Sequence, residues 1–198
     1  GSDVVNVVST ATYADKNVAY LNGAVTYKTI GVAGVSLTGA DATNYSVSST
    51  GSARANITPR VLTVAYTGVD RVYDGTTVAT VTTADDRVVG DVLTLARTAS
   101  YADKNVGAGK AVAVSNASLS GVDANNYSLA STSGNTSATI TQRALTLSFF
   151  GVDKVYDGTL SASVTTDPTI ALGYVAGDAL TVSRTAVFAS KDVVYDNS

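Results

Sequence analysis

Carboxylates are the commonest ionisable side chains in this sequence. All sixteen acidic residues are aspartates, and Asp85, Asp86 and Asp91 lie in one predicted loop. Calcium takes about six to eight hard oxygen ligands, so this loop is a candidate calcium site. The loop by itself supplies too few oxygens for such a site. The sequence therefore predicts no cofactor, with calcium at these three residues as the alternative.

The residues that most enzymes use for catalysis are missing. Histidine, cysteine, methionine and tryptophan are absent, which removes thiolate and imidazole nucleophiles, bases and metal ligands. No remaining group titrates near neutral pH to serve as a general base. The net charge is −3 and the basic residues are scattered, so no nucleic-acid partner is indicated. We expect no catalytic residue and no enzyme.

Tyrosines supply the candidate binding groups. Tyr20, Tyr27 and Tyr174 lie in insertions outside the repeated frame, and exposed aromatic residues on loops are common recognition elements. These three residues are the candidates for contact with a glycan, a host protein or another copy of the chain.

The clearest pattern in the sequence is internal repetition. The segment GVDRVYDGT at 68–76 returns as GVDKVYDGT at 151–159, a step of 83 residues. The segment YADKNV stands at 13–18 and 101–106, and returns as FASKDV at 188–193. A motif that recurs in every repeat is expected to form part of the fold of the repeat, whereas an active site normally occurs once. The chain is therefore predicted to be an array of repeats.

The VYDGT motif favours a turn over a metal or catalytic site. Asp74 and Asp157 can bond the backbone of the turn, while Gly75 and Gly158 supply positive φ.

Two further motifs are interpreted in the same structural way. Asp123 and Tyr127 resemble the tyrosine corner of immunoglobulin-like sandwiches, in which the hydroxyl bonds backbone upstream. Asp41 and Tyr45 repeat this pair, and calcium binding at Asp123 lacks the necessary further ligands. Lys104 is expected to form a surface ion pair within a turn, the alternative being the lysine of an isopeptide bond.

Composition and alternation predict strands. The chain is rich in Val, Thr and Ser and has no Glu, which favours β-structure over helix. Alternation predicts strands at 61–66, 77–83, 91–101, 110–119, 126–131 and 136–142. Asn22-Gly23 between alternating residues predicts a type I′ hairpin. The expected fold class is all-β, with tandem immunoglobulin-like antiparallel β-sandwich repeats in an elongated array.

The repeat boundaries can be placed in two ways, which we call the two phases of the array. In the favoured one, 1–60 is the C-terminal part of a first repeat, 61–143 a complete repeat and 144–198 the N-terminal part of a third. In the other phase, repeats at 3–90 and 91–177 are followed by a terminal strand at 178–198.

Four segments together resemble a known family. DKVYDGT, YADKNVG, LSGVDANNYSL and ITPRVLTV are similar to the YDG repeat of bacterial filamentous-hemagglutinin-like surface adhesins, which is related to MBG-type repeats. The resemblance covers essentially the whole chain, with departures at Gln142 in place of Pro and in FASKDV. It implies export, tandem repetition and a place in an extracellular stalk or fibre, and it carries over no catalytic residue.

These observations lead to one expected function and one alternative. We expect a stiff extracellular stalk or spacer on the bacterial cell surface, because the connections between repeats are very short. Its partners would be neighbouring repeats of the same chain, and copies that exchange strands through 1–58 and 144–198. The alternative is an adhesive module that binds a ligand. Membrane insertion is not expected, since no apolar run approaches ~18 residues.

Overall fold

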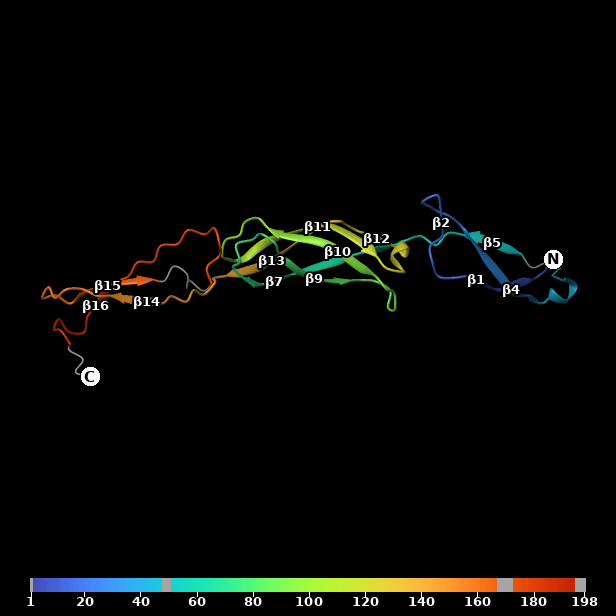
Figure 1. Ribbon diagram of the computed structural model, residues 1–198. Coiled ribbons are helices and arrows are strands. Elements are labelled where there is room, and N and C mark those ends of the chain that lie inside the picture. The colour runs from blue at the N-terminus through green and yellow to red at the C-terminus, as the bar shows by residue number, and fades with distance from the viewer. Residues whose placement is uncertain (1, 48–50, 167–172, 195–198) are drawn as a thin grey trace. The chain divides into compact units, whose positions relative to one another are not determined.

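The protein is built almost entirely from β-strands, which confirms the all-β prediction (Figure 1). The computed structural model describes residues 2–47, 51–166 and 173–194. Two single-turn 3-10 helices, η1 (Ala42–Asn44) and η2 (Ala124–Asn126), accompany the strands. Among the described residues, no helix is long and apolar enough to cross a membrane.

The chain forms two compact units, each from three segments. One comprises Gly1–Tyr66, Thr83–Thr98 and Val114–Gly134, and the other comprises Thr67–Thr82, Ala99–Ala113 and Asn135–Ser198. The repeat boundaries expected from the sequence remain predictions.

The N-terminal sheet has the order β1-β4-β5. Strands β1 (Asn6–Tyr13), β4 (Lys28–Thr38) and β5 (Ser52–Ala55) pair antiparallel. The hairpin of β2 (Tyr20–Leu21) and β3 (Ala24–Val25) turns at Asn22 and Gly23, whose φ values are 50° and 79°. Positive φ at both positions is what a type I′ turn requires, so the predicted hairpin is confirmed.

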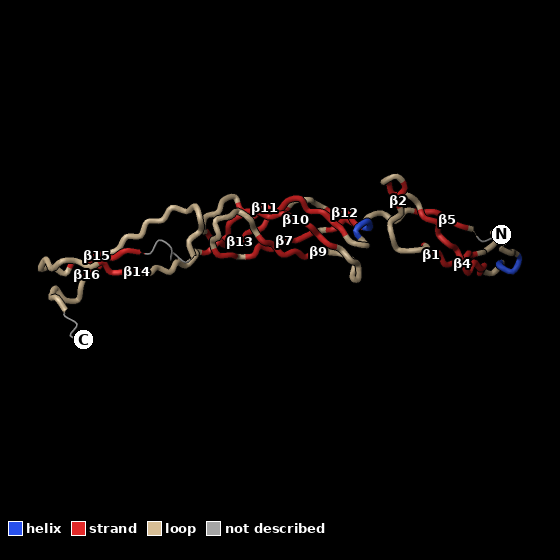
Figure 2. The backbone as a smooth tube through the Cα atoms, viewed as in Figure 1, coloured by secondary structure: helices blue, strands red, loops and turns tan. Residues whose placement is uncertain are grey.

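The central strands form three sheets, drawn in red in Figure 2. One has the order β10-β11-β13-β8, and the others pair β7 with β9 and β12 with β6. All six predicted segments contain strand, but 61–66 is divided between β6 and β7, which lie in different sheets, and the short strand β8 was not predicted. The bounds are β6 (Arg60–Leu62), β7 (Val64–Val69), β8 (Arg71–Val72), β9 (Thr80–Asp85), β10 (Thr94–Tyr101), β11 (Gly107–Ser120), β12 (Tyr127–Leu129) and β13 (Gly134–Thr141).

Two strand pairs run parallel, which corrects the prediction of purely antiparallel pairing. Strand β12 pairs parallel with β6, and β13 pairs parallel with β8. Side-chain alternation reports which face of a strand is buried and carries no information on strand direction. Parallel pairing needs a long connection between the two strands, and most of the repeat separates each of these pairs.

Burial is concentrated in the central repeat. Apart from Val18, the buried apolar residues of the described chain all lie between Leu62 and Ile140. Leu62, Leu93 and Tyr127 form one cluster, against which Val64, Leu119, Ala124 and Leu129 pack. Leu145, which occupies the position of Leu62 in the next repeat, is 41% exposed, whereas Leu62 is fully buried.

The C-terminal sheet is antiparallel with the order β14-β15-β16. Its strands are β14 (Phe149–Val152), β15 (Ser161–Thr166) and β16 (Ala186–Val187). Phe149 and Phe150 are each 50% exposed, so this sheet leaves large apolar side chains in contact with solvent.

Candidate functional site

The YADKNV motif folds into a turn that we call the lysine turn, residues 15–18, with equivalents at 103–106 and 190–193. Asp15 Oδ1 accepts a hydrogen bond from the N–H of Asn17 at 2.8 Å, and Lys28 pairs with the same carboxylate. Lys28 Nζ also donates to the carbonyl of Asn17 at 3.0 Å. These bonds fix the shape of the turn and leave Lys16 at its tip free to point outward.

The second lysine turn repeats these contacts. Asp103 Oδ1 accepts from the N–H of Asn105 at 2.8 Å and pairs with Lys110, which donates to the carbonyl of Asn105 at 2.7 Å. The pKa of Asp103 is held below its usual value by Lys110 and then by this backbone bond. The same local hydrogen bonds therefore build the turn in these two copies.

The lysine turn binds a set of residues that we call the acceptor site. It consists of Asp91, Asp123, Asn126 and Tyr127. Asp123 Oδ2 accepts from the N–H of Val92 at 2.9 Å, which ties η2 to the chain beside Asp91. Gly121 allows this close approach, since its φ is +115° and a Cβ there would lie 2.5 Å from the carbonyl oxygen of Val92. Only glycine fits such a position without strain.

Tyr127 holds Asp91 in place. Its hydroxyl accepts a hydrogen bond from the N–H of Val88 at 2.9 Å and donates to Asp91 Oδ2 at 2.6 Å. Burial, followed by the bond to Asp91, raises the pKa of Tyr127. The tyrosine hydroxyl does bond upstream backbone, but at Val88, 39 residues away, and not a few residues upstream as in a tyrosine corner. The bond to the carboxylate was not predicted.

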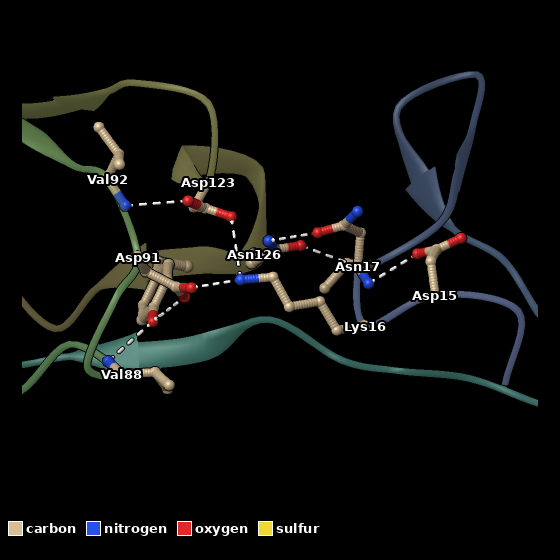
Figure 3. Close-up of polar contacts among 10 residues, drawn as sticks. Asp15, Lys16, Asn17, Val88, Asp91, Val92, Asp123 and Asn126 are labelled. Atoms are coloured by element: carbon tan, nitrogen blue, oxygen red, sulfur yellow. Dashed lines mark hydrogen bonds and ion pairs between the residues drawn. The ribbon is translucent and has the colours of Figure 1, made fainter. Parts of the chain in front are cut away.

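The lysine turn docks on the acceptor site through charge and directed hydrogen bonds (Figure 3). Lys16 Nζ forms an ion pair with Asp91 Oδ1 and lies 3.4 Å from Asp123 Oδ1. Asn126 Nδ2 donates to Asn17 Oδ1 at 3.0 Å, and Asn126 Oδ1 accepts from the N–H of Val18 at 2.9 Å. Because the side-chain amide of Asn126 both donates and accepts, it can form both hydrogen bonds with the turn in one register only.

Charge in the acceptor site is arranged for a cation. The side chain of Asp91 is 7% exposed and that of Asp123 is 13% exposed. Lys16, followed by Tyr127, holds the pKa of Asp91 below its usual value, and Asp91 raises the pKa of Lys16. The Lys16 side chain is 65% exposed, so water and salt screen the pair. The hydrogen bonds of Asn126 must therefore supply much of the specificity.

The second lysine turn makes the corresponding contact with the next repeat. Lys104 Nζ lies 2.5 Å from Asp178 Oδ1, and Tyr73 donates to the same oxygen at 2.9 Å. Lys104, then Tyr73, lowers the pKa of Asp178. Lys104 thus forms an ion pair as predicted, although its partner lies 74 residues away and not within the turn. Val106, Leu145 and Val175 line a pocket beside this pair.

The VYDGT motif forms the predicted turn in both copies. Asp74 Oδ1 accepts from the N–H of Thr76 at 2.9 Å, and Asp157 Oδ1 accepts from that of Thr159 at 2.9 Å. Lys154, followed by these bonds to Thr159, lowers the pKa of Asp157 to about 2. Gly75 and Gly158 have φ values of 80° and 75°.

The three candidate calcium ligands each have a protein partner. Asp85 forms two hydrogen bonds with the Arg87 guanidinium, at 2.7 and 2.6 Å. Asp86 accepts from the N–H of Thr63 at 2.9 Å, and Asp91 belongs to the acceptor site. Within the part of the chain that the structure describes, no three acidic side chains gather as a metal site would require. Calcium binding stays a prediction without a preformed cluster to support it.

The three candidate tyrosines have different surroundings. Tyr20 donates to the carbonyl of Asn125 at 2.8 Å, so it is part of the contact between the lysine turn and η2. Tyr27 is 55% exposed and stacks under the Arg54 guanidinium, 4.8 Å from the ring centroid. Tyr174 is 42% exposed and belongs to the other compact unit. Ligand binding by Tyr27 and Tyr174 stays a prediction.

Fold and site together define a class of protein, a tandem β-repeat in which the turn of one copy is bound by the next. The YDG domain family matches residues 58–134 and 141–198. Because these two matches cover more than half of the chain, the protein belongs to the YDG domain family. No curated protein and no solved structure matches the chain.

Proposed function

We propose that this chain is part of the repeat region of a large secreted bacterial surface adhesin, where it acts as a stiff extracellular stalk or spacer. Its repeats are proposed to be immunoglobulin-like sandwiches. The observation that carries the proposal is the ion pair of a lysine turn with an aspartate of the following repeat, at Lys16 and Asp91 and again at Lys104 and Asp178.

A contact of this kind restricts how two consecutive repeats bend and twist. A short linker limits only distance, whereas the lysine turn is held by Asp91 and Asn126. Tyr20, just after the turn, is held separately by the carbonyl of Asn125. Bonds at several points oppose rotation about any single one of them. Consecutive repeats joined in this way are proposed to move together as a stiff unit, as in other arrays in which each repeat contacts its neighbours.

The contacts of the central repeat also allow further repeats to be added to the array. The central repeat carries both an acceptor site, at Asp91, and a lysine turn, at Lys104. A repeat that carries both an acceptor site and a lysine turn can be joined to further copies in series. The resemblance to filamentous-hemagglutinin-like adhesins and the cysteine-free composition support export to the cell surface.

The function is tested by breaking the contacts without changing side-chain size. In the double variant Asp91→Asn and Asp178→Asn, we expect small-angle X-ray scattering at high dilution to give a broader distribution of interatomic distances than for the unmodified chain. Asp70→Asn is the matched control, because Asp70 accepts a hydrogen bond from the N–H of Thr139 within its own repeat. Identical distributions for all three proteins would contradict a stiff spacer.

The location is tested separately. An antibody raised against this chain should label intact cells that produce the parent protein. Labelling that appears after lysis and is absent before it would contradict the surface location.

A further inference from the structure

We propose that Asn22 is a site of spontaneous chemical modification, at which the backbone nitrogen of Gly23 displaces the side-chain amide and leaves isoaspartate or aspartate in the β2–β3 hairpin. The proposal is independent of the function proposed above, because it concerns two adjacent residues of one turn. It adds a reaction, with water as the co-reactant, and a consequence for the hairpin that carries Tyr20.

The reaction is a ring closure between an asparagine side chain and the backbone of the next residue. Asparagine is a chemically labile residue type. The nitrogen of Gly23 gives up its proton to solvent and bonds to Cγ of Asn22, while the bond from Cγ to Nδ2 breaks and that nitrogen leaves as ammonia. Water then opens the five-membered imide at one of its two carbonyls. One opening gives aspartate, and the other gives isoaspartate, in which the chain continues through the side-chain carbonyl.

Asn22 is followed by the residue that hinders this attack least. Asn22-Gly23 is the only Asn-Gly pair in the sequence, and most of the other asparagines precede a β-branched or aromatic residue. Glycine has no Cβ beside the attacking nitrogen and reaches backbone conformations closed to other residues. An added Cβ at Gly23 would meet nothing within 4 Å, so the space around the turn is open.

Both reacting groups are unengaged. In a two-residue turn the hydrogen bond joins the flanking residues, here Leu21 and Ala24, which pair in the structure. Within residues 2–47, 51–166 and 173–194, the N–H of Gly23 and the side chain of Asn22 have no hydrogen-bond partner. Asn22 is exposed, so water reaches the site.

The hairpin is short enough to open. Strands β2 and β3 have two residues each, and their pairs are Tyr20 with Val25 and Leu21 with Ala24. An isolated two-stranded hairpin is marginally stable in water, and segments with few contacts open locally at little cost in free energy. Opening frees the backbone of Asn22, whose φ is 50° in the closed turn, for the rotation that ring closure requires.

The edge of the repeat that carries the hairpin is open in the central copy as well. Figure 1 shows the hairpin, labelled β2, extending away from β4 and β5. In the central repeat the shorter turn 107–109 takes its place, since Lys28 and Lys110 follow the two segments and each pairs with the aspartate of its own lysine turn. An added Cβ at Gly109 would also meet nothing within 4 Å. Solvent therefore reaches this edge in both copies.

The two Asp-Gly pairs of the VYDGT motif are protected from the same ring closure. An aspartate must be protonated for its oxygen to leave as water. Lys154, followed by the bonds to Thr159, lowers the pKa of Asp157 to about 2, and the backbone bond to Thr76 is the main cause that lowers the pKa of Asp74. Each carboxylate is also held by the N–H two residues on. The hairpin instead combines a following glycine with a free side chain.

Isoaspartate would change the shape of the hairpin. It adds one methylene to the backbone between β2 and β3, and loop length fixes the pairing of a two-residue hairpin. Tyr20, at the base of the hairpin, donates to the carbonyl of Asn125 at 2.8 Å. We expect the modified hairpin to lose this hydrogen bond.

Peptide mapping by mass spectrometry tests the modification on the full chain, incubated in neutral buffer made with water enriched in a heavy oxygen isotope. We expect isoaspartate to accumulate at position 22 ahead of every other position, with uptake of the heavy isotope. The signal should be lost in Asn22→Gly, because Gly-Gly forms the same type of turn. Aspartate without isoaspartate, an unchanged Asn22, or a greater yield of isoaspartate at Asp74 or Asp157 overturns the proposal.

Hydrogen exchange tests the consequence for the hairpin. The N–H of Thr26 donates to the carbonyl of Ala19 at 2.9 Å, at the base of the hairpin. Its exchange should be faster in molecules that carry isoaspartate than in the fresh protein. In Asn22→Gly it should be the same before and after incubation. Exchange at Thr26 that is as slow in the modified chain as in the fresh one would show that the hairpin accommodates isoaspartate, and would overturn the expected loss of the Tyr20 contact.

Discussion

Tyr127 donates a 2.6 Å hydrogen bond to one oxygen of Asp91, and Lys16 forms an ion pair with the other. One carboxylate thus links the core of its own repeat to the turn of the preceding one. Asp178 has the equivalent place in the repeated sequence, but both of its partners in the next contact, Tyr73 and Lys104, come from the preceding repeat. Changes that loosen Asp91 or Asp178 are expected to weaken the contact between repeats before they weaken the repeats themselves.

Acid should release the repeat contacts. The folded protein lowers the pKa of Asp91 and Asp178 below 3.8, so the unfolded chain binds more protons in that range. Their contribution to stability is complete above pH 3.8 and is lost as the pH falls through the folded pKa values. Thermal melts from pH 7 to 2 should show the unmodified chain converging on the Asp91→Asn, Asp178→Asn variant at the acid end. A constant difference between the two proteins would contradict this linkage.

Removing the Tyr127 hydroxyl should destabilise the protein. In Tyr127→Phe the N–H of Val88 loses its acceptor and Asp91 loses a donor, which we expect to cost about 1–3 kcal/mol in the free energy of unfolding. Urea unfolding measures this loss. Tyr45→Phe is the matched control, and it should lose less because Tyr45 is 50% exposed against 7% for Tyr127.

Leu62 should be among the most sensitive apolar positions. It is fully buried, so Leu62→Ala removes packing and leaves a cavity, at a cost of about 2–5 kcal/mol. Leu145→Ala changes the equivalent residue in the next repeat, which is 41% exposed, and should cost much less. Equal losses for the two variants in urea unfolding would show that the C-terminal segment is packed as tightly as the central repeat.

Gly121 is expected to tolerate no side chain. Gly121 and Gly90 both have positive φ, but an added Cβ meets the Val92 carbonyl at Gly121 and open space at Gly90. Gly90→Ala should therefore cost about 1–2 kcal/mol from backbone strain alone, and Gly121→Ala clearly more. Unfolding free energies of the two variants make the comparison, and a smaller loss at Gly121 would contradict the close approach.

Chelation should leave stability unchanged. Asp85, Asp86 and Asp91 bond Arg87, Thr63 and Tyr127 respectively, so their oxygens are engaged without metal. The melting temperature is expected to be the same in EDTA and in millimolar calcium. A melting temperature that rises with calcium concentration would reveal binding to the folded state and would restore the calcium interpretation of this loop.

Local features of the fold could be predicted from the sequence, whereas contacts between distant residues could not. The Asn22-Gly23 hairpin and the Asp74 turn follow from the conformations and hydrogen bonds available to a few adjacent residues. The pairing of Lys16 with Asp91 spans 75 residues, and no local rule connects them. Asp91 was recognised as a candidate ligand, but its cation is a lysine of the chain. The recurrence of both residue types in every copy was the available signal.

The two parallel strand pairs determine how the central repeat would carry tension. Strand β8 lies near the start of the repeat and β13 at its end, and Ile140 and Thr141 pair in parallel with Arg71 and Val72. Pulling the chain from its two ends then drives these strands past each other along their length. The hydrogen bonds between them are loaded together and in shear, whereas a hairpin pulled from its open end loses its bonds one at a time.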